Sequence, residues 1–294
     1  MTLATGRQYE ITAQGQAAVI TEVGATLRSW TVSGQERLLT HGADEMGDSQ
    51  MGKVLAPWPN RIDHGRYEFQ GTAYQLPLAE PAKLNAIHGL VNWVPWQPRE
   101  QHADRVTMGY VLYPQKGYPF TLDLALEYAL TGDGLHVTLT ARNVGRLSAP
   151  FGAGYHPYLL LDESALLTVP ADSYLRTDDR LIPVGKAPVA GTPFDFRTPR
   201  AVDGTELDTG YTDLHRADGV ATAQLDQVQL WVDDTHGYLQ VYTDNAAPPS
   251  RTRRSGIALE PMTAAPNAFN SGDGLLTLEP GRAYQGSWGL RTTT

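Results

Sequence analysis

The residues most able to do chemistry are a carboxylate and an imidazole set inside apolar, strand-like sequence. Glu260 closes the apolar run at residues 257–259, and Pro261 follows it, where a central strand does not simply continue. His156 lies in the segment FGAGYHPY, between aromatic residues and just before Pro157. A carboxylate at the end of a buried strand is costly unless it is paired or used. A carboxylate and an imidazole together suit proton transfer near neutral pH.

Two further segments, APWPNRIDHGRYEFQG and IHGLVNWVPW, add polar groups to this pair. They contain Arg61 and His88, and their tryptophans are Trp58, Trp93 and Trp96. Each polar residue could instead have a structural role, in a turn or beside a neighbour, and each tryptophan could simply pack in the core. The combination of these residues with His156 and Glu260 favours a functional site.

Several classes of chemistry lack their signatures. There is no Walker loop and no G-x-S-x-G, and FGAGYHP has a proline where a dinucleotide fingerprint needs Gly or Ala. The chain has no cysteine, and its eight histidines include no closely spaced pair, so we expect neither a metal nor a cofactor. The net charge of −9 argues against a nucleic-acid partner. Without a signal-peptide pattern or an apolar run near ~18 residues, we expect a cytoplasmic protein with no membrane partner.

The elements that must position these residues are strands. Period-2 alternation dominates the chain, and its clearest hairpin is FTLDLALEYAL–TGDG–LHVTLTARN at residues 120–143. A smaller hairpin is expected in RYEFQGTAYQLPL at residues 66–78. The many glycines (29) and prolines (20) indicate frequent turns. No repeat or linker divides the chain, so we predict one all-β domain over residues 1–294.

The polar segments together resemble the aldose 1-epimerase (galactose mutarotase-like) family. The resemblance covers residues from about 55 to the C-terminus and rests on PNRI with a following G-x-Y-x-F-x-G, then IHGL, G-x-x-HPY and LEPMT-x-x-PNAFN-x-G. It implies a large antiparallel β-sandwich with the site in an open cleft on one sheet. It also implies that Glu260 is the catalytic base and His156 the acid, while Arg61, His88 and Asn60 bind sugar oxygens.

The family also has a substrate-binding Asp between the acid and the base. Asp208 in ELDTGYTDLH is the better match, and Asp213 is the second candidate. This segment lacks the His that follows the Asp in galactose mutarotases, which leaves the preferred sugar open. The flat face of Trp58 would suit the apolar face of a pyranose, which makes it a candidate substrate contact.

The predicted function is therefore interconversion of the anomers of a free aldose, with a small sugar as partner. One alternative is a hexose-6-phosphate 1-epimerase. Asn92 stands where such enzymes often carry Arg, although Arg251, Arg253 and Arg254 offer a phosphate contact. A glycoside hydrolase would need two carboxylates flanking the bond and would leave His156 idle. A non-catalytic sugar-binding domain would not need both His156 and Glu260.

Overall fold

The computed structural model describes residues 2–161, 164–202, 204–243 and 255–293. Its strands pair antiparallel, as predicted, and helical structure is confined to the short η1 (Pro81–Lys83) and α1 (Ala268–Ser271) in this part of the chain. None of its helices has the length and apolar character needed to span a membrane.

The largest sheet contains the predicted long hairpin. Its nine strands follow the order β10 (Gln97–Gln101), β11 (Arg105–Leu112), β12 (Leu122–Thr131), β13 (Gly134–Asn143), β27 (Ala283–Thr292), β23 (Val228–Val232), β22 (Ala221–Leu225), β17 (Leu166–Thr168) and β20 (Arg200–Ala201). In β12 buried and half-buried residues alternate strictly, because successive side chains of a strand point to opposite faces. β12 and β13 pair antiparallel, with Leu126 opposite Leu139, which confirms the predicted hairpin.

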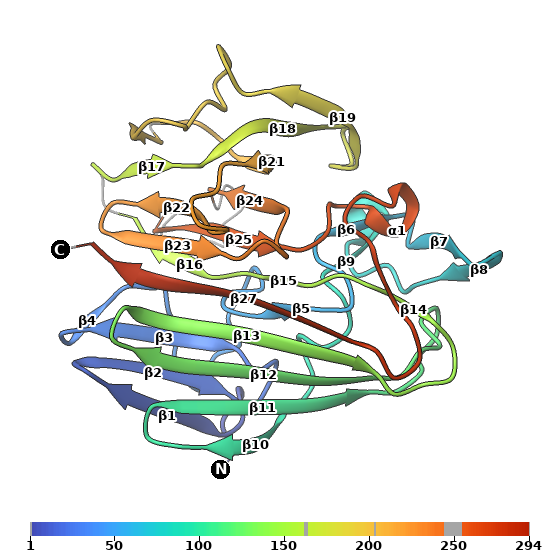
Figure 1. Ribbon diagram of the computed structural model, residues 1–294, viewed down its shortest axis with the longest axis horizontal. Helices are drawn as coiled ribbons and strands as arrows, with labels where there is room; N and C mark the ends of the chain where they lie inside the picture. The colour runs from blue at the N-terminus through green and yellow to red at the C-terminus, as the bar shows by residue number, and fades with distance from the viewer. Residues whose placement is uncertain (1, 162–163, 203, 244–254, 294) are drawn as a thin grey trace.

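The second large sheet carries the chemistry-bearing residues. Its eight strands follow the order β19 (Pro183–Pro188), β18 (Ala171–Thr177), β21 (Asp208–Leu214), β24 (Tyr238–Tyr242), β25 (Gly256–Met262), β15 (Gly154–Tyr155) and β5 (Val54–Leu55), with β16 (Tyr158–Leu160) also paired to β25. Every residue of β25 is buried, so this strand lies at the centre of the sheet. Figure 1 shows the strands β19, β18, β21, β24 and β25 of this sheet above the long strands β11, β12, β13 and β27.

Smaller sheets complete the described structure. They are a four-stranded sheet of β1 (Gln8–Ala13), β2 (Gln16–Thr21), β3 (Leu27–Val32) and β4 (Gln35–Glu36), and the pairs β6 (Arg61–Asp63) with β9 (Asn85–Ile87), β7 (Arg66–Phe69) with β8 (Thr72–Gln75), and β14 (Ala149–Phe151) with β26 (Leu276–Leu278). The β7–β8 pair is the smaller hairpin predicted from the sequence. In Figure 1 the sheet of β1–β4 lies at the opposite end of the molecule from β18 and β19.

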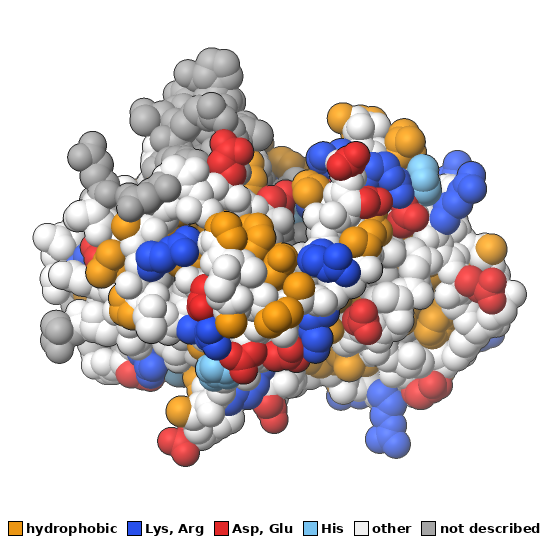
Figure 2. Space-filling model, turned by 90° about the horizontal axis from the view of Figure 1, so that it is seen from above, with side chains coloured by type: hydrophobic (Ala, Val, Ile, Leu, Met, Phe, Trp, Pro, Cys, Tyr) orange, Lys and Arg blue, Asp and Glu red, His pale blue; other side chains and the backbone are white. Residues whose placement is uncertain are grey.

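One apolar core joins the two large sheets. Tyr155 of β15 packs against Trp288 of β27 with ring centroids 5.1 Å apart, which connects the sheets across their facing surfaces. Both residues belong to the same buried cluster as Leu126 and Leu139. This is the layered arrangement of a β-sandwich, in which inner faces supply the core. On the outside, acidic and basic side chains alternate with apolar ones over the face seen in Figure 2.

Candidate active site

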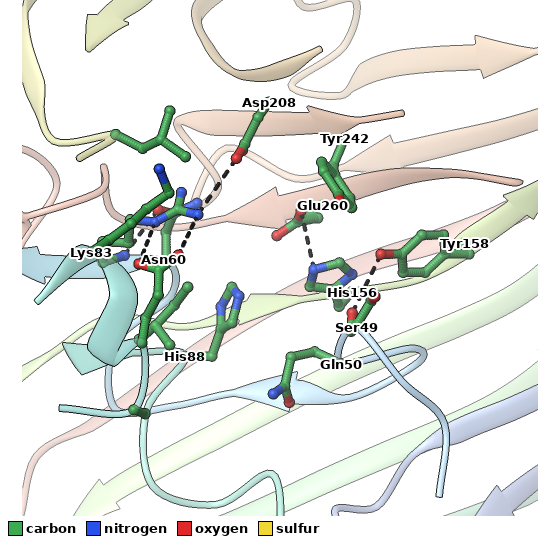
Figure 3. Close-up of a pocket in the computed structure, with 15 residues that line it drawn as sticks. Ser49, Gln50, Asn60, Lys83, His88, His156, Tyr158, Asp208, Tyr242 and Glu260 are labelled. Atoms are coloured by element: carbon green, nitrogen blue, oxygen red, sulfur yellow. Dashed lines mark hydrogen bonds and ion pairs between the residues drawn. The ribbon is translucent and has the colours of Figure 1, made fainter. Parts of the chain in front are cut away.

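Six residues singled out from the sequence line one cavity of about 440 Å³ on the eight-stranded sheet. They come from separate elements: Asn60 precedes β6, His88 follows β9, and His156 lies between β15 and β16. The other three are Arg61, Asp208 and Glu260. Figure 3 shows Asp208 and His88 on opposite walls, with His156 and Glu260 facing each other beside them.

His156 and Glu260 are in direct contact on the floor of this cavity. Nε2 of His156 lies 3.3 Å from Oε1 of Glu260, and both side chains are buried. The backbone on either side of His156 is fixed by loop 52–53, because its N–H donates to the carbonyl of Lys53 and its carbonyl accepts from Gly52. The ring of Tyr158 stacks on the imidazole, with centroids 5.1 Å apart. The imidazole is therefore positioned from three directions.

Burial shifts the pKa values of this pair in opposite directions. Desolvation raises the pKa of Glu260 well above its usual range; the charge of Asp208 adds to this, and Arg61 opposes it. Desolvation also lowers the pKa of His156 well below that of free imidazole. Between these two pKa values the pair holds one proton, and the contact between Nε2 and Oε1 is the path along which it can move.

His88 forms the wall next to the acid–base pair. Its ring lies edge-on to His156, with centroids 5.4 Å apart, and burial lowers its pKa well below the ordinary value. A neutral His88 has one ring nitrogen that donates and one that accepts. Its Nδ1 is buried and has no hydrogen-bond partner among the described residues, so it is available to a ligand.

Arg61 is held by two carboxylates. Its Nε and Nη2 donate to Glu80 at 2.9 and 3.0 Å, and Nη2 also lies 3.5 Å from Asp208. Burial acts to lower the pKa of Arg61, but the hydrogen bonds with Glu80 and the charge of Asp208 outweigh it and raise this pKa. Asp208 in turn accepts a hydrogen bond from the side chain of Gln240. The guanidinium is therefore fixed in orientation and permanently charged.

Left-handed backbone conformations concentrate around the cavity. Ser49, Gln50, Asn60, His88 and Leu181 line it and have φ values of 49°, 60°, 51°, 63° and 62°. Such conformations in residues other than glycine are strained and often mark functional sites. No sequence motif indicated Ser49, Gln50 or Leu181.

Further lining residues could not be found from sequence motifs. Glu80 precedes η1 and Lys83 ends it, in a segment without a motif, and only a tertiary contact brings Glu80 to Arg61. Tyr158 belongs to the HPY segment, which is the one signal that pointed to it. The remaining lining residues that were not anticipated are Ala79, Ile87 and Tyr242.

The tryptophans do not line the cavity, which is a correction to the expectation for Trp58. Trp58 is buried against Phe269, with ring centroids 5.7 Å apart. Trp96 is also buried, and its indole N–H donates to the carbonyl of Val91. Trp93 is 51% exposed, with the ammonium of Lys53 4.1 Å above its ring. Core packing therefore accounts for Trp58 and Trp96, which both belong to the buried apolar cluster.

Of the two aspartates considered for substrate binding, the geometry favours Asp208. It lines the cavity, whereas Asp213 is exposed and pairs with Lys186 at 2.9 Å. Arg251, Arg253 and Arg254, the arginines considered for a phosphate contact, lie outside the described residues. The part of the chain that the structure describes holds no group of three or more His, Asp or Glu side chains arranged to bind a metal ion.

Comparison with known proteins identifies the family to which this chain is similar. A family model described as aldose 1-epimerase matches residues 7–291. The uncharacterized protein YihR of Escherichia coli is 35% identical over 289 residues, covering 96% of this chain and 92% of that protein. The galactose mutarotase of Mus musculus is 32% identical over 56% of this chain and 48% of its own length. The structure of the GalM/aldose epimerase homologue from C. elegans superposes with a TM-score of 0.87 over 98% of this chain and 99% of that chain; at 20% identity this likeness concerns the fold.

Proposed function

The chain belongs to the aldose 1-epimerase family and is an isomerase acting on carbohydrates, and from that premise we propose that it interconverts the α and β anomers of a free aldose. The observation that carries this proposal is the contact of 3.3 Å between His156 and Glu260 inside a cavity of about 440 Å³. A base and an acid that share one proton are what ring opening and closure of a cyclic sugar require.

The reaction begins with the proton of the pair. Its transfer from Glu260 to Nε2 of His156 leaves a carboxylate and an imidazolium. The carboxylate then takes the proton of the anomeric hydroxyl, while the imidazolium gives its proton to the ring oxygen. The bond between C1 and the ring oxygen breaks as C1 becomes an aldehyde, and C1 rotates about the C1–C2 bond. The reverse transfers close the ring on the other face of the aldehyde, and the imidazolium then returns its proton to Glu260, which restores the initial state of the pair.

The polar wall of the cavity orients the sugar for these transfers. We assign the binding of sugar hydroxyls to Arg61, His88, Asn60 and Asp208, which offer both donors and acceptors. A charged guanidinium beside the reacting atoms also stabilises the negative charge that develops on the sugar oxygens. Because Glu80 and Asp208 hold the guanidinium in place, little reorganisation is needed during the reaction.

A phosphorylated aldose is the second candidate, and Lys83 is the observation in its favour. The ammonium of Lys83 lines the cavity and donates to the carbonyl of Asp179 at 3.2 Å, without an ion pair to a carboxylate in the described part of the chain. Against this candidate, the other cation of the cavity, Arg61, already contacts two carboxylates. We therefore give priority to a free aldose.

An anomerisation assay separates these possibilities. Freshly dissolved single anomers of several aldoses and of their 6-phosphates are followed by polarimetry or NMR, with spontaneous mutarotation subtracted. Faster equilibration of free aldoses is the expected result, and acceleration of the phosphates alone would favour the second candidate. A protein that binds aldoses without accelerating equilibration would be a sugar-binding domain.

A methyl glycoside separates an epimerase from a hydrolase. It has no anomeric hydroxyl proton to remove, so it should inhibit competitively and remain unchanged. Release of methanol would instead identify a glycoside hydrolase.

A further inference from the structure

Gln50 is a cavity residue to which the proposed chemistry assigns no role. It lies on the loop between β4 and β5, and both it and Ser49 have left-handed backbones, with φ values of 60° and 49°. This strained conformation is held by contacts on both sides. The carbonyl of Gln50 accepts from the backbone N–H of Lys53 at 3.0 Å, and the carbonyl of Ser49 accepts from the hydroxyl of Tyr158 at 3.4 Å. The fold therefore presents the side chain of Gln50 to the cavity at the cost of local strain.

The side-chain amide of Gln50 is oriented by Asn92. The Nδ2 group of Asn92 donates to Oε1 of Gln50 at 2.7 Å, and Asn92 itself is buried. Since the carbonyl of the Gln50 amide is occupied in this way, its Nε2 group, which has two N–H donors, is the part left for a ligand.

The position of Gln50 relative to the acid–base pair indicates which part of a sugar it meets. Figure 3 shows Gln50 on the far side of His156 from Glu260. In the proposed mechanism Glu260 marks the anomeric hydroxyl on C1, and His156 marks the ring oxygen. The ring oxygen joins C1 to C5, so a group opposite Glu260 across His156 lies towards the substituent on C5.

The charge distribution of the cavity agrees with this assignment. Lys83 and Asn60 lie on the other side of His88 from Gln50 and Tyr158 in Figure 3, and Arg61, which follows Asn60 in the chain, binds the carboxylates of Glu80 and Asp208. The side of Gln50 has uncharged neighbours, Ser49, Tyr158 and Tyr242, which line the cavity with it. An uncharged donor in uncharged surroundings suits a neutral oxygen acceptor such as a hydroxyl group.

We propose that Gln50, oriented by Asn92, is a specificity-determining residue that donates a hydrogen bond to the exocyclic hydroxyl on C6 of an aldohexopyranose. This inference rests on the proposed function, because it uses the roles of Glu260 and His156 to orient the sugar. It adds a substrate class to that function: neutral aldohexoses are preferred over 6-deoxyhexoses and aldopentoses.

The test compares sugars that differ only at the C5 substituent. The probe is whichever of D-glucose, D-galactose and D-mannose the wild-type protein equilibrates fastest, together with its 6-deoxy counterpart. We expect the wild-type kcat/KM to be about 5- to 10-fold higher for the hexose, as one neutral hydrogen bond provides. Gln50→Leu should lower kcat/KM for the hexose to near that of the 6-deoxy sugar, while the 6-deoxy value changes by less than about 2-fold.

Two further variants show whether the effect belongs to the hydrogen bond. Asn92→Leu removes the group that orients the amide and should reduce the ratio in the same direction, but less. Gln285→Leu makes the same change at an exposed position of β27, where the side chain contacts Thr140, and should leave the ratio unchanged.

The outcomes that overturn the assignment are distinct from failure of the proposed function. A wild-type protein that does not distinguish the two sugars, or a Gln50→Leu variant that loses both activities equally, would leave Gln50 with a structural role only. Absence of catalysis with every aldohexose would overturn the proposed function itself.

Discussion

At the scale of single residues, the site combines two groups whose burial opposes their charged forms. Glu260 and His156 are the acid–base pair in the proposed mechanism, and Nε2 of His156 lies 3.3 Å from Oε1 of Glu260. Neither group would hold this arrangement in water, where the carboxyl would lose its proton and the imidazole would titrate freely near neutral pH. The environment of the sheet, rather than the residue types, sets this balance.

Replacing either member of the pair should strongly reduce turnover without abolishing binding. Glu260→Gln keeps the shape of the side chain but cannot accept a proton, and His156→Gln cannot donate one to the ring oxygen. We expect each variant to lose about 10²–10⁴-fold in kcat, as for removal of one acid–base group. Because the two act together, the double variant should be little worse than the weaker single variant. If Glu260→Gln kept most of its turnover with sugar affinity unchanged, Asp208 would become the next candidate base.

The pH dependence of turnover should follow the proton count of the pair. Activity needs the form with one proton, so kcat/KM should form a broad bell whose two limbs belong to the pair as a whole. Since burial lowers the pKa of His156, the acidic limb should fall below 6.5, the ordinary value for imidazole. Since burial raises the pKa of Glu260, the alkaline limb should fall well above 4.5. An acidic limb centred above pH 6.5 would contradict this arrangement.

The raised pKa of Glu260 also makes a prediction about stability. A carboxyl whose folded pKa exceeds its unfolded pKa contributes stability that is fully present below the unfolded value and is lost as pH rises through the folded value. Glu260→Gln removes that loss, so its free energy of unfolding should exceed that of the wild type by about 1–3 kcal/mol at pH 8. The difference should vanish near pH 4. Thermal or urea unfolding at both pH values tests this, and an equal difference at both would count against the shifted pKa.

At the scale of elements, strand ends and tight loops bring the site together. Asn60 and His88 are linked through the backbone, because the N–H of His88 donates to the carbonyl of Asn60 at 2.9 Å. Residues just outside β6 and β9 are thereby fixed relative to each other, and the Arg61 guanidinium is held from η1 and β21. The chemistry therefore depends on how closely these loops can approach one another.

Gly89, the residue after His88, provides a test of that close approach. It has a φ of +75°, and a Cβ placed on it would lie 2.1 Å from the carbonyl oxygen of Ala56. Gly71, in the β7–β8 turn, has a similar φ of +77° but nothing within 4 Å, so it is a matched control. Gly71→Ala should cost about 1–2 kcal/mol of unfolding free energy from backbone strain alone. Gly89→Ala should lower the unfolding free energy by about 1–3 kcal/mol more than Gly71→Ala, because the backbone at Ala56 or Gly89 must move to admit the methyl group. The same movement should displace His88.

The measurement for both variants is equilibrium unfolding, followed by the anomerisation assay on the folded protein. We expect Gly71→Ala to keep its activity and Gly89→Ala to lose part of it even where it is fully folded. Equal stability of the two variants would mean that the backbone around Ala56 accommodates the extra atom.

At the scale of the whole molecule, two large antiparallel sheets enclose one apolar core and leave the face of β25 to form the floor of the cavity. The fold holds the site residues in position, and the side chains of those residues determine the reaction. That residues 1–294 form a single domain stays a prediction from the sequence.

We predict that the activity of the whole molecule does not depend on a metal ion. The chain has no cysteine, and its described residues bring no three potential ligands together around a point. We therefore expect kcat to stay within about 2-fold of its initial value after exhaustive dialysis against EDTA, because the residues themselves move the protons. Loss of activity that Mg²⁺, Mn²⁺ or Zn²⁺ restores would show that the acid–base assignment is incomplete.

The sequence by itself determined the fold class and the identity of the proposed reacting pair. Period-2 alternation fixes which residues point inward along a strand, and a carboxylate or imidazole inside such a strand is visible without coordinates. Only the tertiary structure shows that Asp208, and not Asp213, lines the cavity, that Trp58 lies in the core, and that Gln50 lines the cavity. The physical reason is that these outcomes depend on contacts between distant segments, such as Arg61 with Asp208, which are 147 residues apart. The local sequence pattern does not show which distant segment will lie next to a given residue, because the packing of the sheets determines that contact.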